Sequence, residues 1–444
     1  MSVVQFNLDQ PELEFTASGG STVRRTVLPS GVRVLTETVP GAQSASVSFA
    51  VAVGSRDEVN GHHGSTHFLE HLLFKGTKTR TALDIAVAFD SVGGASNAST
   101  GKEHTSYYAR VQDKAIPVAV EVIADMLTSS VIDPVEFENE RTVILEELAM
   151  NDDDPQDVAH EKFFEAVLLG HELGRPIGGT PETIKAVSRD AVWDHYQNNY
   201  RPEDLVITAA GGVDHDALLA LVDENLEKAG WDRNLKSTPK AWRPQGSVVI
   251  EPQVSVEVIN RPIAQANIIL GSLGLVAGDS RRYAMAILNT VLGGGMSSRL
   301  FQEIREKRGL AYSVYSFNQG YSDGAAFGLY AGCSPQKANE VIKLMVAELG
   351  KVAHDGITEA ELALAKGNIS GGLALKFEST QARMSRLSGA ELTDGEFFDL
   401  DESLRRYEEV QLGDVQALAK LMFEAPKSYV AVGEVKQSLF DEFV

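Results

Sequence analysis

The residues best suited to chemistry lie in the stretch HFLEH, which contains His67, Glu70 and His71. Residues four apart lie one turn apart on a helix, so the imidazoles of His67 and His71 would leave the same face and converge on one ion. Two histidines in this geometry suit zinc. Glu70 lies beside His71, too close to be a comfortable third ligand but well placed to take a proton from water. We therefore expect a zinc site with Glu70 as the general base.

The neighbouring residues favour a metal site over the alternative, a buried, hydrogen-bonded cluster of the same side chains. Apolar residues fill the other faces of the turn: Phe68, Leu69, Leu72, Leu73 and Phe74. Such an inner helix is a costly place for unpaired histidines and a carboxylate. A bound metal ion would satisfy these polar groups.

A tetrahedral catalytic zinc with two histidines needs one more protein ligand and one open position. Residues 134–148 read as a helix, with Asp133 as its N-cap. At about 100° per residue, Glu140 and Glu147 project within about 20° of each other, whereas Glu146 points away. We expect Glu147 to be the third ligand and Glu140 to support the ligands by hydrogen bonding. Taken alone, Glu147 would more often be a solvated helix residue, and only the histidine pair favours its role as a ligand.

These motifs resemble the pitrilysin, insulysin and mitochondrial processing peptidase family of inverzincin metallopeptidases. The resemblance rests on the HxxEH order, on Glu147 lying 76 residues after His71 (147 − 71), and on the phrase ERTVILEE at 140–147. The phrases GSRDE at 54–58 and RGLAYSVY at 308–315 also match, so the resemblance covers almost the whole chain. It is closest to the short bacterial processing-peptidase-like members.

The resemblance implies roles for these and further residues. In the family, the residues matching His67, His71 and Glu147 bind zinc, and the residue matching Glu70 is the base. The asparagine matching Asn97, which precedes Ala98, fixes the backbone of a peptide laid along a sheet edge. On the residues alone, Asn97 and Ala98 near a Gly-Gly turn would be turn chemistry. Ser99 departs from relatives that carry an aromatic residue there, which leaves the shape of any side-chain pocket open.

Arg305 and Tyr312 are further candidates, on an expected helix over 297–307 and at the start of the next strand. A guanidinium and a phenol near a developing oxyanion would stabilise a tetrahedral intermediate. Their seven-residue spacing matches the family's catalytic arginine and tyrosine. By themselves they would be a helix C-terminal charge and a strand residue.

Composition places the chain among soluble globular proteins, with 43% hydrophobic and 23% charged residues over 444 positions. The net charge of −22 argues against nucleic acid or an anionic membrane as a partner. We find neither an apolar run of about 18 residues nor a signal-peptide pattern, so we expect a cytoplasmic protein. The single cysteine, Cys333, excludes an intrachain disulfide and is expected to be a core thiol.

The pattern along the chain predicts the elements that position the site. We expect a hairpin around 29–31, a strand over 47–53 leading to the metal helix, and strands over 103–111 and 205–210. We expect helices over 83–92, 115–129, 134–150, 155–169 and 214–229.

Two halves of the chain resemble each other. Ile132-Asp133 returns as Ile357-Thr358 at an offset of 225, and Gly211 to Val213 returns as Gly433 to Val435 at an offset of 222. We therefore predict an α+β fold of two homologous domains, each a largely antiparallel sheet packed with helices. The predicted domains are 1–229, with the zinc site, and 248–444, which supplies Arg305 and Tyr312, joined by a polar linker at 230–247. The second half repeats no ligand set, so one zinc per chain is expected.

The function predicted from these features is that of a zinc-dependent endopeptidase. It would hydrolyse peptides or unfolded protein segments with a zinc-activated water. Relatives with four such domains enclose their substrate, so a homodimer is expected for a chain with two. The alternative is a non-catalytic assembly or peptide-binding subunit. Such members usually lack part of the HxxEH set, whereas this chain carries the whole set.

Overall fold

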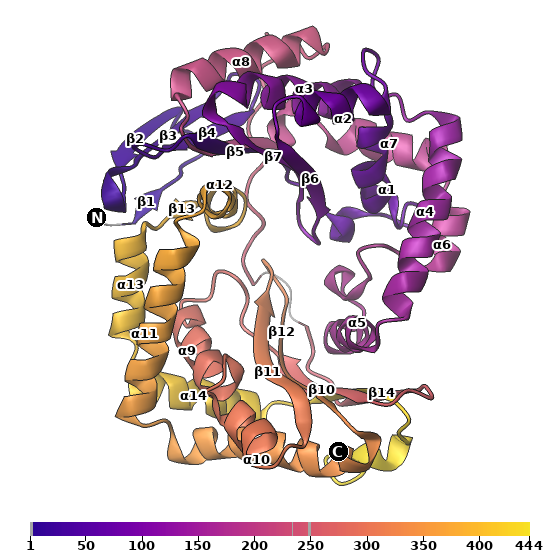
Figure 1. Ribbon diagram of the computed structural model, residues 1–444, viewed down its shortest axis with the longest axis vertical. Helices are drawn as coiled ribbons and strands as arrows, with labels where there is room; N and C mark the ends of the chain where they lie inside the picture. Colours follow the sequence, from indigo (N-terminus) through magenta and orange to yellow (C-terminus); the bar gives the residue numbers. More distant parts are fainter. Residues whose placement is uncertain (1–2, 233, 247–249) are drawn as a thin grey trace. The chain divides into compact units, whose positions relative to one another are not determined.

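A computed structural model describes residues 3–232, 234–246 and 250–444 (Figure 1). Contacts group the chain into two compact units. Unit 1 contains Met1–Leu148, Pro176–Trp242 and Ala374–Glu402, and unit 2 contains Ala149–Arg175, Arg243–Leu373 and Ser403–Val444.

Unit 1 is built on a seven-stranded sheet in which only β4 and β8 pair in parallel. In spatial order the strands are β2 (Glu12–Thr16), β3 (Thr22–Val27), β4 (Arg33–Thr38), β8 (Leu205–Gly211), β5 (Ser44–Val51), β7 (Thr105–Gln112) and β6 (Ala95–Thr100). The short strands β1 (Val4–Gln5) and β13 (Glu396–Phe397) pair separately. The predicted hairpin at 29–31 joins β3 to β4.

Helices cover both faces of this sheet, and alternating side chains feed two cores. Val34 packs in the core that contains Phe68 of the HxxEH stretch, whereas the next residue, Leu35, packs in the core that contains Leu387. The helices of unit 1 are α1 (Ser65–Leu72), α2 (Ala82–Asp90), α3 (Ile116–Ser129), most of α4 (Pro134–Asp152), α6 (Pro181–Ala186), α7 (Arg189–Asn199), α8 (His215–Lys228) and α12 (Thr380–Gly389).

Unit 2 has a five-stranded sheet of the same design. Its strands lie in the order β11 (Ala311–Gly320), β12 (Ala325–Cys333), β10 (Ala266–Leu273), β14 (Ser428–Gly433) and β9 (Ser255–Asn260), and only β14 and β9 are parallel. The helices are α5 (Pro155–Val167), α9 (Arg282–Gly293), α10 (Ala338–Asp355), most of α11 (Glu359–Lys376), most of α13 (Leu400–Glu409) and α14 (Leu412–Glu424).

The two sheets confirm the duplication. The order β6-β7-β5-β8-β4 of unit 1 recurs as β11-β12-β10-β14-β9, with its one parallel pair in the same place. The fold is therefore α+β with two homologous domains, as predicted.

The contact units differ from the predicted boundaries in two segments, each of which covers one face of the other half's sheet. Helix α5, from the first half of the sequence, packs on β10 and β14, and α12, from the second half, packs on β5 and β8. Buried ion pairs hold the second segment: Arg25 donates to Glu391 at 2.7 Å, and Arg386 donates to Glu37 at 2.9 Å. Residues 233 and 247 of the predicted linker lie outside the described residues, and its described part has no helix or strand. Lys240 contacts the Asp204 carboxylate at 3.0 Å, so this part of the linker is fixed to unit 1.

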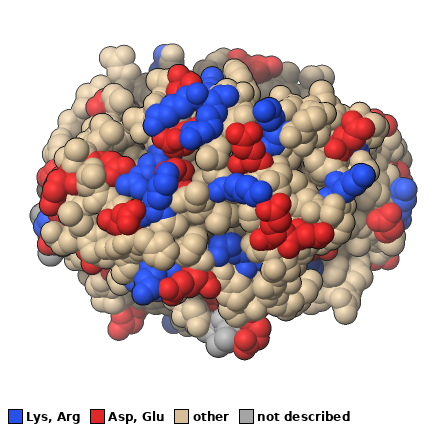
Figure 2. Space-filling model, turned by 90° about the horizontal axis from the view of Figure 1, so that it is seen from below, with Lys and Arg blue, Asp and Glu red and all other residues tan. Residues whose placement is uncertain are grey.

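The surface and the single thiol agree with an ordinary globular protein. On the face that Figure 2 shows, basic and acidic side chains lie next to one another, so this face has no broad field of one sign. Cys333 is buried, and burial raises the pKa of its thiol to about 12. No helix in the described ranges combines the length and apolar character needed to cross a membrane.

Candidate metal centre

Helix α1, which carries the HxxEH stretch, is held at its N-terminus by a carboxylate. The two oxygens of Glu58 accept hydrogen bonds from the backbone N–H groups of Gly64 and Thr66, both at 2.8 Å. This satisfies donors that a helix start leaves unpaired. Gly64 has φ of 94°, and a Cβ there would lie 2.4 Å from Ile184 Cδ1, so only glycine fits.

Helix α4 lies against α1 as the sequence predicts. Asp133 caps it by accepting from the Val135 N–H at 2.8 Å. The rings of Phe68 on α1 and Phe137 on α4 stack with centroids 4.8 Å apart. This packing turns one face of α4 toward the histidines.

Three ligand atoms converge between the two helices. The Nε2 atoms of His67 and His71 lie 3.3 Å apart, and Glu147 Oε2 lies 3.6 Å from the first and 3.5 Å from the second. A tetrahedral zinc with bonds of 2.0–2.1 Å separates its ligand atoms by about 3.3–3.4 Å. The donor set and its spacing therefore fit zinc with one open position. Among the described residues, no other group of three histidine, cysteine or acidic side chains converges in this way.

The surroundings prepare both histidines to donate their Nε2 lone pairs. His71 Nδ1 lies 2.9 Å from Glu140 Oε2, a contact that assigns the proton to Nδ1 and leaves Nε2 for a metal. Burial, and then the neighbouring His71, lower the pKa of His67, which keeps that imidazole neutral. Glu146, the residue before Glu147 on α4, is exposed and lies outside the three-atom group.

Glu70 lies on α1 next to the three-atom group and reaches the edge of the sheet. Its Oε2 accepts a hydrogen bond of 2.5 Å from the Thr100 hydroxyl. Thr100 ends β6, the edge strand of the unit 1 sheet. Asn97 and Ala98 lie in the middle of the same strand, and Asn97 Oδ1 accepts from the Ala98 N–H at 2.9 Å. A free strand edge therefore leads to the candidate base.

Arg305 and Tyr312 lie in unit 2, next to each other. The Arg305 guanidinium carbon lies 4.5 Å from the centre of the Tyr312 ring, and Nη1 donates to the Tyr312 carbonyl at 2.8 Å. Arg305 belongs to a π-helical turn, Phe301–Glu306, within the predicted helix. Tyr312 sits at an irregularity in the pairing of β11, an edge strand, and 75% of its surface is exposed.

Comparison with known proteins shows the family of this chain. Residues 33–181 match the family description "Insulinase (Peptidase family M16)", and residues 186–369 match "Peptidase M16 inactive domain". The chain belongs to peptidase family M16. Both histidines, Glu70 and Glu147 lie within the first matched segment.

M16 relatives match over most of their length. A protein described as an uncharacterized zinc protease of Streptomyces coelicolor is 46% identical over 94% of this chain and 91% of its own length. The uncharacterized zinc protease YmxG of Bacillus subtilis is 36% identical over 90% of this chain and 96% of its own length.

Solved structures show the M16 fold as well. A protease from Helicobacter pylori has a TM-score of 0.82 at 24% identity, covering 92% of this chain and 98% of its own. A peptidase M16 inactive domain from Pseudomonas fluorescens has a TM-score of 0.83 at 19% identity, covering 93% of this chain and 97% of its own.

Three residues that contact the candidate site or its helix were not predicted: Glu58, Thr100 and Lys75. Glu58 lies in the GSRDE phrase, which indicated the family resemblance but not the hydrogen bonds of Glu58 to the start of α1. Thr100 follows the Asn-Ala pair, but its role depends on β6 being a strand beside α1. Lys75 follows the metal helix, and its Nζ contacts Glu140 Oε1 at 2.7 Å. Only the lysine's closeness to HFLEH in the sequence could have drawn attention to it.

Proposed function

We propose that this protein is a zinc-dependent endopeptidase that hydrolyses peptides or unstructured protein segments. The observation that carries the proposal is the convergence of His67, His71 and Glu147 at tetrahedral spacing. A candidate base, Glu70, lies beside this group, and it is bonded to a strand with a free edge. A purely structural metal site would need neither the base nor the open position.

Each residue of unit 1 has a separate task in this mechanism. Zinc held by the two histidines and Glu147 would supply Lewis acidity and lower the pKa of a water. Glu70 would accept the proton of the attacking water and return it to the leaving amine. The edge of β6, with Asn97, would hold the substrate backbone as an added strand, so an unfolded segment would be the preferred substrate.

Arg305 and Tyr312 are proposed to stabilise the oxyanion of the tetrahedral intermediate. Two observations within unit 2 support this role: the Arg305 guanidinium lies over the Tyr312 ring, and the Tyr312 side chain is exposed. Such a phenol can donate a hydrogen bond to a substrate without a rearrangement of the core.

The rival function is a non-catalytic subunit that binds peptides or assembles with a partner. It would require no general base, yet Glu70 is present and is oriented by a hydrogen bond. This favours the peptidase.

Digestion of a defined peptide mixture, read by mass spectrometry, tests the proposal. The purified protein should produce new peptide termini, a chelator should abolish them, and added zinc should restore them. The Glu70→Gln variant is the matched control, because it keeps the ligands and removes the base. Products that resist chelation would contradict the zinc-dependent mechanism. A protein that binds the peptides and cuts none of them would argue for the rival.

A further inference from the structure

Lys75 ends the short helical turn η3 (Leu73–Lys75) directly after the metal helix. Its ammonium lies 2.7 Å from Glu140 Oε1, and the other oxygen of Glu140 lies 2.9 Å from His71 Nδ1. Glu140 itself is only 3% exposed. One buried carboxylate thus bridges the lysine and a candidate zinc ligand.

We propose that Lys75 is a positioning residue of the metal site, which acts through Glu140 to orient His71 toward the metal. The inference rests on the zinc site of the proposed function and extends it to a residue outside the ligand set. Lys75 does not belong to the three-atom group and is proposed to touch neither metal nor substrate.

The physical reason is the balance of donors around Glu140. With Lys75 in place, each carboxylate oxygen has a donor, so the plane of the group is fixed. Without the ammonium, Oε1 would be buried and short of a donor, which is unfavourable unless the side chain turns. A turned carboxylate would no longer hold the His71 ring, and the loss of such outer hydrogen bonds weakens metal binding by about 10- to 100-fold.

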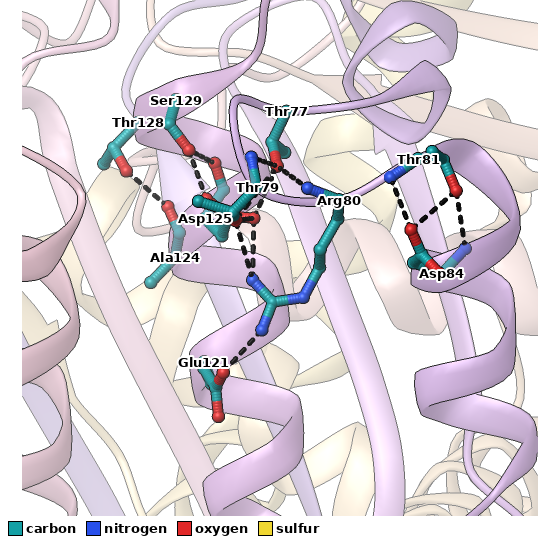
Figure 3. Close-up of polar contacts among 10 residues, drawn as sticks. All are labelled: Thr77, Thr79, Arg80, Thr81, Asp84, Glu121, Ala124, Asp125, Thr128 and Ser129. Atoms are coloured by element: carbon teal, nitrogen blue, oxygen red, sulfur yellow. Dashed lines mark hydrogen bonds and ion pairs between the residues drawn. The ribbon is translucent and has the colours of Figure 1, made fainter.

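The segment after Lys75 is fixed by a second buried carboxylate, Asp125 on α3 (Figure 3). Asp125 Oδ2 accepts from the hydroxyls of Thr77 and Thr79 at 2.6 and 2.9 Å and from Arg80 Nη1 at 2.7 Å. Arg80 also contacts Glu121 on the same helix at 2.5 Å. The backbone after Lys75 is therefore tied to α3, and the ammonium reaches Glu140 from a rigid support.

A merely stabilising ion pair is the competing explanation, since the Lys75 side chain is 35% exposed. Partly exposed pairs contribute little to stability, and a pair of that kind would leave metal affinity unchanged. Zinc affinity therefore separates the two explanations.

The test compares Lys75→Met with Lys78→Met in the full-length protein. Lys78 is exposed, lies three residues further along the same segment and has no contact with Glu140 among the described residues. Zinc affinity is measured by competition with a chromophoric chelator, and the melting temperature of the zinc-free protein is measured alongside. We expect Lys75→Met to bind zinc about 10- to 100-fold more weakly, Lys78→Met to match the wild type, and Lys75→Arg to recover most of the loss.

Equal zinc affinities in the Lys75→Met and Lys78→Met variants would overturn the inference. If Lys75→Met does not fold, Lys75→Gln replaces it, because the shorter neutral side chain also loses the contact, and the same weakening is expected. A wild-type protein that binds zinc but cuts no peptide would contradict the proposed function and leave this inference standing. A wild-type protein that binds no zinc would remove both.

Discussion

The hydroxyl of Thr100 donates a 2.5 Å hydrogen bond to Oε2 of Glu70, and this contact joins the metal helix to the edge strand β6. One oxygen of the candidate base is thereby held, and in the proposed mechanism the other would accept the proton of the water. The same strand carries Asn97, so the part of unit 1 proposed to hold the substrate also orients the base.

Removal of the Thr100 hydroxyl should therefore slow catalysis without weakening zinc binding. We expect Thr100→Val to lower kcat by about 10- to 100-fold, because a carboxylate free to rotate is less often aligned. Thr100→Ser should retain most of the activity, and Ser99→Ala, at an exposed neighbour, should change little. Steady-state kinetics on one peptide gives kcat and KM for each variant, and the zinc content of each variant is measured in parallel. A rise in KM with an unchanged kcat would assign Thr100 to substrate binding instead.

The two adjacent glutamates of α4 should differ sharply. Glu147→Gln should weaken zinc binding, because an amide oxygen is a poorer ligand than a carboxylate, whereas Glu146→Gln should leave it unchanged since Glu146 is exposed. Metal analysis after dialysis against a weak chelator measures the difference. Equal zinc losses in the two variants would mean that α4 presents a different face to α1.

Asp125 should make a pH-dependent contribution to stability. Burial alone would raise its pKa, but hydrogen bonds from Ser129, Thr77, Arg80 and Thr79 together lower the pKa. A carboxyl whose pKa is lower in the folded state stabilises the protein above its unfolded pKa of about 3.9, and that stability is lost as the pH falls through the folded value.

Asp125→Asn should therefore cost about 1–3 kcal/mol at pH 7, and the gap to the wild type should narrow below about pH 4. Urea unfolding at a series of pH values measures this gap. Asp84→Asn, in the exposed capping box of α2, is the comparison. Hydrogen bonds from Thr81 lower the pKa of Asp84 as well, so its difference should narrow over the same pH range but stay smaller than that of Asp125→Asn. A gap for Asp125→Asn that stays constant down to pH 3 would contradict the stabilising role of its charge.

The first half of the sequence should not fold alone. Residues 1–242 lack the segment Ala374–Glu402, so Glu37 would lose Arg383 and Arg386, and Arg25 would lose Glu391. Glu37 and Arg25 are fully buried, and unpaired buried charges are strongly destabilising. We expect no cooperative thermal transition for this fragment and a soluble complex when residues 243–444 are co-expressed. A fragment that melts as the full chain does would show that the segment Ala374–Glu402 is not needed for folding.

Much of the site could be predicted because it depends on local periodicity. The spacing of His67, Glu70 and His71 predicts one helical face, and the angular positions on α4 select Glu147 over Glu146. Repeats at constant offsets predicted two homologous domains, each with a largely antiparallel sheet. These inferences need no knowledge of long-range pairing.

Features that depend on long-range pairing could not be predicted from the sequence. The sequence around Asn97 has the composition of a turn, and only its pairing with β7 makes it a strand that delivers Thr100 to Glu70. The sequence did not predict that α5 and α12 each pack on the sheet formed by the other half of the chain. Charged residues such as Arg25 and Glu37 predict solvent exposure, whereas here they form ion pairs in the interior. The substrate, the homodimer and the roles of Arg305 and Tyr312 stay predictions.

Zinc titration of the metal-free protein tests the central claim most directly. Peptide hydrolysis should rise linearly with added zinc and level off at one equivalent per chain. Glu70→Gln should take up the same single equivalent and lose most of the hydrolysis, because its amide cannot accept the proton. Full hydrolysis without zinc, or by the zinc-loaded Glu70→Gln protein, would contradict the assignment of this site as a zinc peptidase centre.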